Sequence, residues 1–176
     1  MKKFELTSEF ITNISGTKLF RIKALVEFGN VKAGELGGYI EKEENLDQDG
    51  DAWVYGNAWV CGDAEVYGDA EVCGDAWVCG DARVYGNAWV YGDAEVYGDA
   101  WVYGDADYAY AHGFGSEYRT TTFFRLRNGD VGVRCGCFYG TLQEFRDKVR
   151  ATHKETKKAK EYLMLADLME LRFLKE

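Results

Sequence analysis

Residues 51–104 consist of one six-residue unit repeated nine times: DAWVYG, NAWVCG, DAEVYG, DAEVCG, DAWVCG, DARVYG, NAWVYG, DAEVYG and DAWVYG. Each unit begins with Asp or Asn, has Ala second and Val fourth, and ends with Gly. A short fixed period of this kind indicates a repeat architecture, in which each unit packs mainly against its neighbours. The repeat therefore sets the architecture of the middle of the chain.

Each unit predicts a short strand followed by a corner. Alternate side chains of a strand point to opposite faces, so Ala52 and Val54 share one face while Trp53 and Tyr55 share the other. The Gly56–Asn57 pair favours a turn, because Gly adopts positive φ and Asn bonds to the local backbone. Three strands and three corners make a triangular coil of 18 residues. The Val and Ala columns of successive coils then stack ~4.8 Å apart and fill the interior.

An aliphatic residue followed four positions later by a small one, every six residues, resembles the hexapeptide-repeat family. This resemblance implies a left-handed parallel β-helix and a homo-oligomer, most often a trimer. The chain departs from the family in having Tyr or Cys after the Val. Residues 36–40 and Asn45–Leu46 predict a degenerate first coil, which extends the β-helix over residues 33–111. With TTTFF at 120–124 and CGCFYGTLQEF at 135–145, the chain is also similar to hexapeptide-repeat proteins of bacteriophages and prophages.

The segments on either side of the repeat are predicted to cap its ends, because an uncapped solenoid exposes unpaired strand edges. Residues 1–32 alternate in polarity around Phe20 and Ile22 and predict an N-terminal β cap. In residues 112–176, Asn128–Gly129 between two β-rich runs predicts a hairpin. A capping box at Thr141–Glu144 then begins one helix, and a second is expected from about Thr156. The C-terminal part is thus expected to be a small α+β (ββαα) domain.

Charge is distributed unevenly along the chain, whose net charge is −9. Residues 33–111 carry −16, whereas the N-terminal and C-terminal segments carry +3 and +4. An acidic repeat does not bind DNA by counterion release, so an anionic partner is expected at one of the ends. No apolar run approaches the ~18 residues of a membrane span, and no signal peptide is recognisable. We expect a cytoplasmic protein with no membrane contact, whose five cysteines are reduced thiols.

The stacking period also predicts what the three outer faces display. Face one carries Trp53, Glu71 and Trp89; face two carries Trp59, Trp77 and Glu95; face three carries Glu65, Arg83 and Trp101. Outward aromatic residues at this density indicate an oligomer interface or a ligand platform. We expect Trp53, Trp59, Trp77 and Trp89 to form the interface of a homo-oligomer, with a trimer favoured. The alternative is that stacked aromatic residues only stabilise the sheets.

Metal and cofactor chemistry is not indicated by the residues present. Cys61 and Cys79 lie one coil apart and are expected to be small packing residues. The Cys135–Cys137 pair with His153 is one ligand short of a structural zinc site unless His112 contributes. We therefore expect no metal and no cofactor.

Enzymatic activity is not indicated either. Acyltransferases of the hexapeptide-repeat family use a His at a coil corner and a loop inserted between coils, and the nine units contain neither. The β-helical carbonic anhydrases need three His ligands, and this chain has two histidines. A non-enzymatic protein is therefore expected, and an acyltransferase-like enzyme is the least favoured alternative.

A candidate ligand site follows the last coil. A Gly-rich loop at 113–116 precedes Arg119 and a Thr run, and three further arginines alternate along the predicted hairpin. Backbone amides, Arg and hydroxyl side chains suit a small anion or phosphate, although a solvated hairpin face explains them equally well. The candidate ligand-binding residues are Ser116, Arg119, Thr120, Arg125, Arg127 and Arg134.

Two classes of function follow from these features. The first is a phage-type decoy that sequesters a small anionic, nucleotide-like ligand of bacterial immunity. The second is a structural or protein-binding module that grips a host protein through its aromatic and acidic faces.

Overall fold

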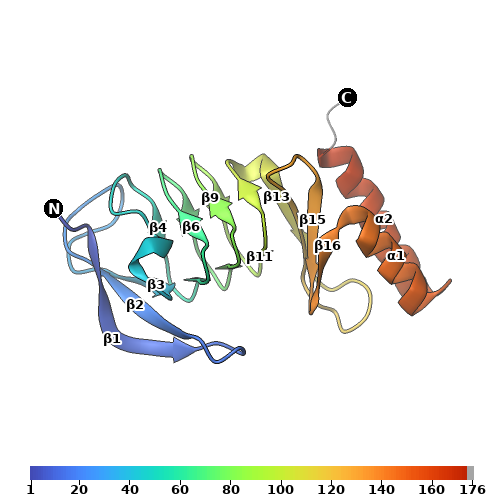
Figure 1. The fold of residues 1–176 in the computed structure, drawn as a ribbon, viewed down its shortest axis with the longest axis horizontal. Coiled ribbons are helices and arrows are strands. Elements are labelled where there is room, and N and C mark those ends of the chain that lie inside the picture. Colours follow the sequence, from blue (N-terminus) through green and yellow to red (C-terminus); the bar gives the residue numbers. More distant parts are fainter. Residues whose placement is uncertain (174–176) are drawn as a thin grey trace.

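The hexads form nine two-residue strands at the third and fourth positions of each unit. The computed structural model describes residues 1–173, and Figure 1 shows them as an elongated array of coils between an N-terminal hairpin and two C-terminal helices. The repeat strands are β4 (Trp53–Val54), β5 (Trp59–Val60), β6 (Glu65–Val66), β7 (Glu71–Val72), β8 (Trp77–Val78), β9 (Arg83–Val84), β10 (Trp89–Val90), β11 (Glu95–Val96) and β12 (Trp101–Val102).

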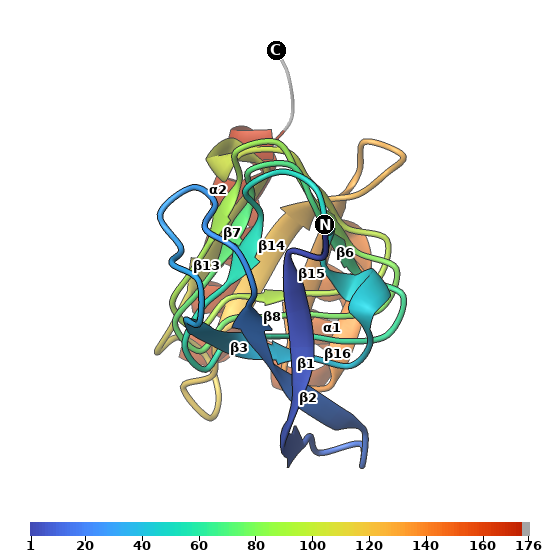
Figure 2. The same cartoon turned by 90° about the vertical axis from the view of Figure 1, so that its left-hand side faces the viewer.

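Strands that are 18 residues apart pair in parallel and in register. The three faces are built by β4-β7-β10, β5-β8-β11 and β6-β9-β12, with Trp59 opposite Trp77 and Val60 opposite Val78. Figure 2 views the triangular section of the β-helix from its N-terminal end. From β7 the chain passes to β8 and then to the face that carries β6, which is an anticlockwise path, while it moves away from the viewer. This is the left-handed sense. The predicted left-handed parallel β-helix with its three faces is confirmed.

The interior consists of the Ala and Val columns that the repeat predicts. The repeat residues from Ala52 to Val102 at these positions are at most 1% exposed. The corner glycines from Gly56 to Gly98 all adopt positive φ, between 61° and 78°. The corner therefore uses the left-handed conformation that costs other residues energy.

The first coil begins upstream of the hexads, as expected. In β3 (Leu36–Ile40), Ile40 lies opposite Val60 and continues the Val column. Gly38 replaces Ala because a Cβ there would lie 2.3 Å from the Ala58 carbonyl oxygen. The 3-10 turn η1 (Glu43–Asn45) follows, and the Asn45 amide donates to the carbonyl oxygens of the next coil.

The N-terminal hairpin extends face two into a six-stranded sheet. Strands β1 (Phe4–Thr12) and β2 (Lys18–Ala24) are antiparallel, and the sheet order is β1-β2-β3-β5-β8-β11. The buried Lys3 Nζ donates to the Ala52 carbonyl oxygen at 3.0 Å, which satisfies an acceptor at the open end of the β-helix. Burial lowers the pKa of this ammonium group.

Trp53 occupies the core of this cap instead of the surface. Its ring is 0% exposed and makes edge contacts with Phe4 at 6.2 Å and Phe28 at 5.3 Å. The expectation that Trp53 lies on an outer face open to a partner subunit is wrong. The reason is that the N-terminal segment folds over face one at the first coil and covers this position.

The C-terminal part is a four-stranded antiparallel sheet backed by two helices. After the 3-10 turn η2 (Asp105–Asp107), the elements are β13 (Tyr108–Ala111), β14 (Thr121–Arg125), β15 (Val131–Cys135), β16 (Phe138–Thr141), α1 (Leu142–His153) and α2 (Lys157–Phe173). The predicted hairpin and both helices are present. The sheet also includes β13, from the expected end of the β-helix, and β16. The last three residues of the expected domain 112–176 lie outside the described part. Within residues 1–173, no helix is long and apolar enough to cross a membrane.

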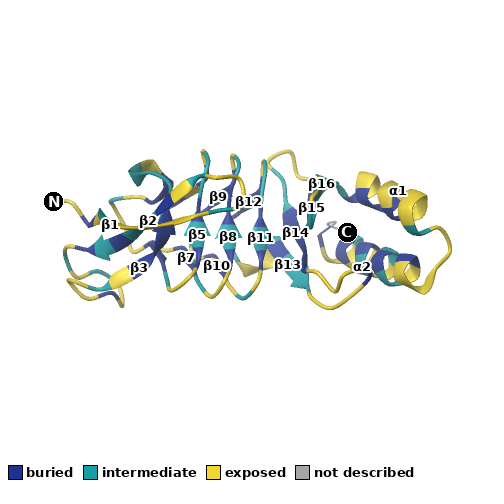
Figure 3. Cartoon of the chain, turned by 90° about the horizontal axis from the view of Figure 1, so that it is seen from below, coloured by how far each residue is buried: buried dark blue, intermediate teal, exposed yellow. Residues whose placement is uncertain are grey.

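This sheet closes the last coil with one face and packs on the helices with the other. Phe124 belongs to the β-helix core, whereas its neighbour Phe123 belongs to a separate core with α1 and α2. The Thr122 hydroxyl accepts a hydrogen bond from the Glu95 amide at 2.9 Å. The closing sheet therefore pairs with backbone groups of the last coil that a further coil would otherwise bind. Figure 3 shows that buried residues continue from the β-helix into this sheet.

Two corner glycines offer a matched test of coil stacking. Both Gly80 and Gly56 have positive φ, but a Cβ on Gly80 would lie 2.8 Å from the Gly98 amide nitrogen, whereas Gly56 has open space. Gly56→Ala should therefore lower the free energy of unfolding by ~1–2 kcal/mol, which is the cost of the left-handed conformation. Gly80→Ala should cost ~1–3 kcal/mol more because of the steric clash. Urea unfolding followed by circular dichroism measures both, and equal losses would contradict the stacking.

Candidate functional site

A cavity of about 170 Å³ lies between the loop that follows β13 and the helices α1 and α2. Two of the predicted ligand-binding residues, Ser116 and Arg119, line it. The remaining lining residues are Glu117, Cys135, Phe138, Phe145, Lys148, Val149, Thr152, His153 and Tyr162. The cavity therefore combines the predicted loop with side chains from the sheet and both helices.

The loop is held against α2 by two side chains. The Tyr162 hydroxyl accepts from the Ser116 amide at 3.2 Å and donates to the Ser116 carbonyl oxygen at 3.3 Å. The Gly115 amide donates to Glu161 Oε2 at 2.9 Å. A Cβ at Gly115 would lie 1.9 Å from the Tyr162 ring, so only glycine allows this close approach. These contacts fix the side of the cavity that carries Ser116.

The same loop contains two strained residues next to Arg119. Glu117 and Tyr118 have φ of 62° and 50°, in the left-handed region that non-glycine residues seldom adopt. Such conformations concentrate at ligand sites, where the surrounding structure over-determines them. The two residues reverse the chain between Ser116 and Arg119, which both line the cavity.

The cavity is lined by cationic groups, one carboxylate from Glu117 and apolar walls. Arg119, Lys148 and His153 supply the cationic or protonatable groups, and within residues 1–173 neither Arg119 nor Lys148 has a carboxylate within 4.0 Å. Burial raises the pKa of Tyr162, which therefore remains a neutral phenol and keeps its hydrogen bond to the Ser116 carbonyl oxygen. The arrangement suits an anionic group attached to a small apolar body.

Three other predicted ligand-binding residues make contacts within the protein and not in this cavity. Arg125 Nε lies 2.9 Å from Asp107 Oδ1, and its Nη1 donates to the Phe173 carbonyl oxygen. Arg127 lies over the Trp101 ring at 5.4 Å. The buried Thr120 places its hydroxyl 2.9 Å from His112 Nδ1.

Arg134 forms part of the junction between the β-helix and the closing sheet. Its guanidinium lies 4.8 Å from the Tyr97 ring centre and 5.4 Å from that of Trp77. Its Nε is 3.5 Å from Glu95 Oε2. Burial raises the pKa of Glu95, while Arg134 favours the charged form of this carboxyl. The expected ligand contact of Arg134 is replaced by this internal ion pair.

The sequence interpretation did not assign nine of the lining residues to the ligand site, among them Lys148, Thr152, Cys135 and Tyr162. Lys148 and Thr152 are four residues apart and therefore lie on one face of α1, beside the buried Val149. These polar residues at the edge of the apolar face of α1 were the feature of the sequence that could have indicated the site. The sequence did not show that this edge of α1 would face the loop of Ser116 and Arg119, because that contact depends on the tertiary packing.

Cys61 and Cys79 form a disulfide, with Cα atoms 4.7 Å apart. The expectation that all five cysteines are free thiols is wrong for this pair, because the coil spacing brings two side chains of the same position together. Cys73, Cys135 and Cys137 are free. Within the described residues, no three His, Cys, Asp or Glu side chains are grouped to hold a metal ion.

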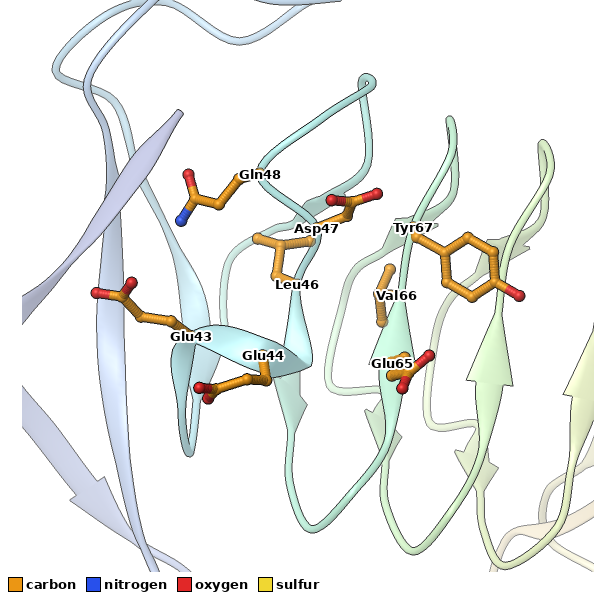
Figure 4. Close-up of a pocket in the computed structure, with 8 residues that line it drawn as sticks. All are labelled: Glu43, Glu44, Leu46, Asp47, Gln48, Glu65, Val66 and Tyr67. Carbon is orange, nitrogen blue, oxygen red and sulfur yellow. The ribbon is translucent and has the colours of Figure 1, made fainter. Parts of the chain in front are cut away.

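A second, larger hollow of about 480 Å³ lies at the opposite end of the β-helix. Figure 4 shows its eight lining residues, with acidic side chains placed around Leu46 and Val66. The carboxylates come from Glu43, Glu44, Asp47 and Glu65, and no Lys or Arg lines the hollow. Its charge repels an anion, so it does not serve the predicted ligand.

The outer aromatic residues include half-buried stacks along the faces and an exposed cluster on face one. Trp59 and Trp77 stack with ring centres 5.0 Å apart and planes 3° apart, as cross-strand pairs that stabilise the sheet. Trp89 and Tyr91 on face one remain 50% and 46% exposed. Their ring centres are 5.4 Å apart, so they form a continuous surface cluster.

Two comparisons with known proteins agree with this fold. Residues 76–92 match the family described as "YdcK Beta solenoid repeat". A 62-residue segment is 39% identical to a protein of Escherichia coli (strain K12) called "Uncharacterized acetyltransferase YdcK", and covers 31% of this chain. The match spans 19% of that protein, so it does not extend to the whole relative. Together with the coils described above, these likenesses identify the chain as a β-solenoid repeat protein.

Proposed function

We propose that this β-solenoid protein is a non-enzymatic binding protein of the cytoplasm, which holds a small anionic ligand in the cavity beside α1. The observation that supports this proposal is the convergence of Arg119, Lys148 and His153 on one pocket that is partly open to solvent. Hydrogen bonds from charged donors to an anion are shorter and stronger than those between neutral groups. The phenol of Tyr162 holds the Ser116 backbone at the same cavity through two hydrogen bonds.

The size of the cavity narrows the class of ligand. About 170 Å³ is less than the ~300 Å³ at the lower end of pockets that enclose drug-sized molecules. A phosphate or carboxylate with a small apolar body fits this space. A nucleotide-like ligand would place only one end inside, with the rest lying over the exposed loop residue Tyr118.

A sequestering role is the form of binding that we favour. It rests on the similarity of the chain to hexapeptide-repeat proteins of bacteriophages, in which a decoy would withhold a nucleotide-like signal of bacterial immunity. In this role, the β-helix is a rigid support and the C-terminal domain is the binding part.

Substitution of Arg119 tests the site. Arg119→Ala should weaken the binding of a phosphate monoester by roughly ten- to hundredfold, because a charge-assisted hydrogen bond is lost. Lys148→Ala should weaken it in the same direction. The measurement is isothermal titration calorimetry with inorganic phosphate and then with nucleoside monophosphates.

Arg127→Ala is the matched control, because Arg127 is also an exposed arginine of the C-terminal domain outside the strands but lies over Trp101. It should bind each probe like the wild-type protein. Equal weakening by Arg119→Ala and Arg127→Ala would indicate a general charge effect and contradict the site. Unchanged binding by Arg119→Ala would contradict it directly.

The second candidate function, protein binding through the β-helix faces, is favoured by the exposed cluster of Trp89 and Tyr91. Under this proposal, face one forms the interface of a homo-oligomer or grips a host protein. Trp89→Ser should convert an oligomer into a monomer in sedimentation-velocity experiments. Tyr103→Ser, which removes a comparably exposed ring from another corner, should not. A monomeric wild-type protein would contradict self-association.

The name of the Escherichia coli relative raises acetyl transfer as an alternative. His112 Nδ1 lies 3.9 Å from Asp93 Oδ2 at a corner of the β-helix. This His–Asp pair is the arrangement at the repeat that most resembles a catalytic base. We expect no release of coenzyme A from acetyl-CoA above the uncatalysed rate, measured by thiol titration. Turnover by the purified protein that His112→Ala abolishes would overturn the non-enzymatic proposal.

A further inference from the structure

The Cys61–Cys79 disulfide joins two consecutive coils of the β-helix. Each cysteine is the fifth residue of its unit and follows a face-two strand, β5 or β8, whose tryptophans lie opposite one another. The Cα separation of 4.7 Å lies in the range that a disulfide spans. Within residues 1–173, this is the one covalent link between coils.

The architecture makes the effect of this link local. In a solenoid, each coil contacts only its neighbours, so the stability of a coil depends on its own two interfaces. The disulfide closes a segment of 18 residues, which strengthens the interface between the coil of residues 51–68 and the next. The C-terminal domain has a separate core and lies at the other end of the array (Figure 1).

The two sulfurs differ in how far a reductant can reach them. Cys61 is half-buried, whereas Cys79 is 3% exposed beneath the same face. An incoming thiolate therefore reaches the sulfur of Cys61 more easily. The other cysteine of the repeat, Cys73, is a free thiol on face one whose pKa is raised by burial.

We propose that Cys61 and Cys79 form a redox-controlled clasp, which fixes the N-terminal coils when oxidised and releases them when a dithiol reduces it. The reductant's first thiolate attacks the Cys61 sulfur, and Cys79 leaves with the electron pair and takes a proton. The second thiolate of the reductant then attacks its own sulfur in the mixed disulfide and releases Cys61, which is protonated. Two electrons and two protons pass to the protein, and the reductant becomes a cyclic disulfide.

Hydrogen–deuterium exchange on the full chain tests the clasp, with dithiothreitol as the reductant. Reduction should raise deuterium uptake in residues 36–68 and leave uptake in residues 112–173 unchanged. It should also lower the Tm by about 6–12 °C, as expected for an 18-residue closure in a chain of this size. Cys61→Ser and, independently, Cys79→Ser should reproduce the reduced state and no longer respond to dithiothreitol.

Cys73→Ser is the matched control, because it removes a thiol from the same β-helix without touching the clasp. It should keep the full response to reduction. The proposal fails if alkylation of the unfolded protein, after exposure of the folded protein to oxidised glutathione, modifies all five cysteines. It also fails if residues 36–68 exchange equally fast in the oxidised and reduced proteins. Phosphate binding in the C-terminal cavity tests a separate site and decides neither outcome.

Discussion

Each coil of this protein lies one strand spacing from the next, so the strand residues of the repeat lie opposite those 18 positions away. This single constraint explains the uniform interior, where Val stacks on Val and Ala on Ala with no room for variation. It also explains why Gly80 cannot carry a side chain, since its Cα faces the backbone of Gly98. The same spacing aligns Trp59 with Trp77 and brings Cys61 to bonding distance of Cys79. Features of quite different chemistry thus have one geometric cause.

The two ends of the array show how a β-helix stops. A coil leaves a row of backbone donors and acceptors that the next coil would pair, and burial without partners would be costly. At the N-terminal end, the Lys3 ammonium and the Asn45 amide bind such carbonyl groups. At the other end, Thr122 accepts from a repeat amide and Phe124 covers the Val column. The non-repetitive segments are therefore required by the repeat, and the candidate site lies in one of them.

The arginines of the C-terminal domain differ in their contacts, and these contacts decide which of them are already paired within the protein. Arg134 and Arg127 lie over aromatic rings of the last coils, and Arg125 is held by Asp107. The acidic, aromatic surface of the β-helix attracts these cations by charge and by cation–π contact. Within residues 1–173, Arg119 forms no ion pair within 4.0 Å, and it follows the strained loop residues Glu117 and Tyr118. It is therefore the arginine on which the proposed ligand site rests.

The strict period of the sequence predicted the inward Ala and Val columns, the glycine corners and the three faces, because alternate residues of each short strand share one side. The left-handed sense of the β-helix was implied by the resemblance to the hexapeptide-repeat family. It also located the C-terminal hairpin and helices through their turn and capping residues. Tertiary structure decided the rest. Trp53 carries the same pattern as Trp89, yet the N-terminal hairpin buries the first and leaves the second exposed. Lys148 and Tyr162 join Ser116 and Arg119 only because α1 and α2 fold back on the loop. The repeat fixes its own contacts at a spacing of 18 residues. Contacts between the non-repetitive segments follow no such spacing, so they are known only once these segments are packed together.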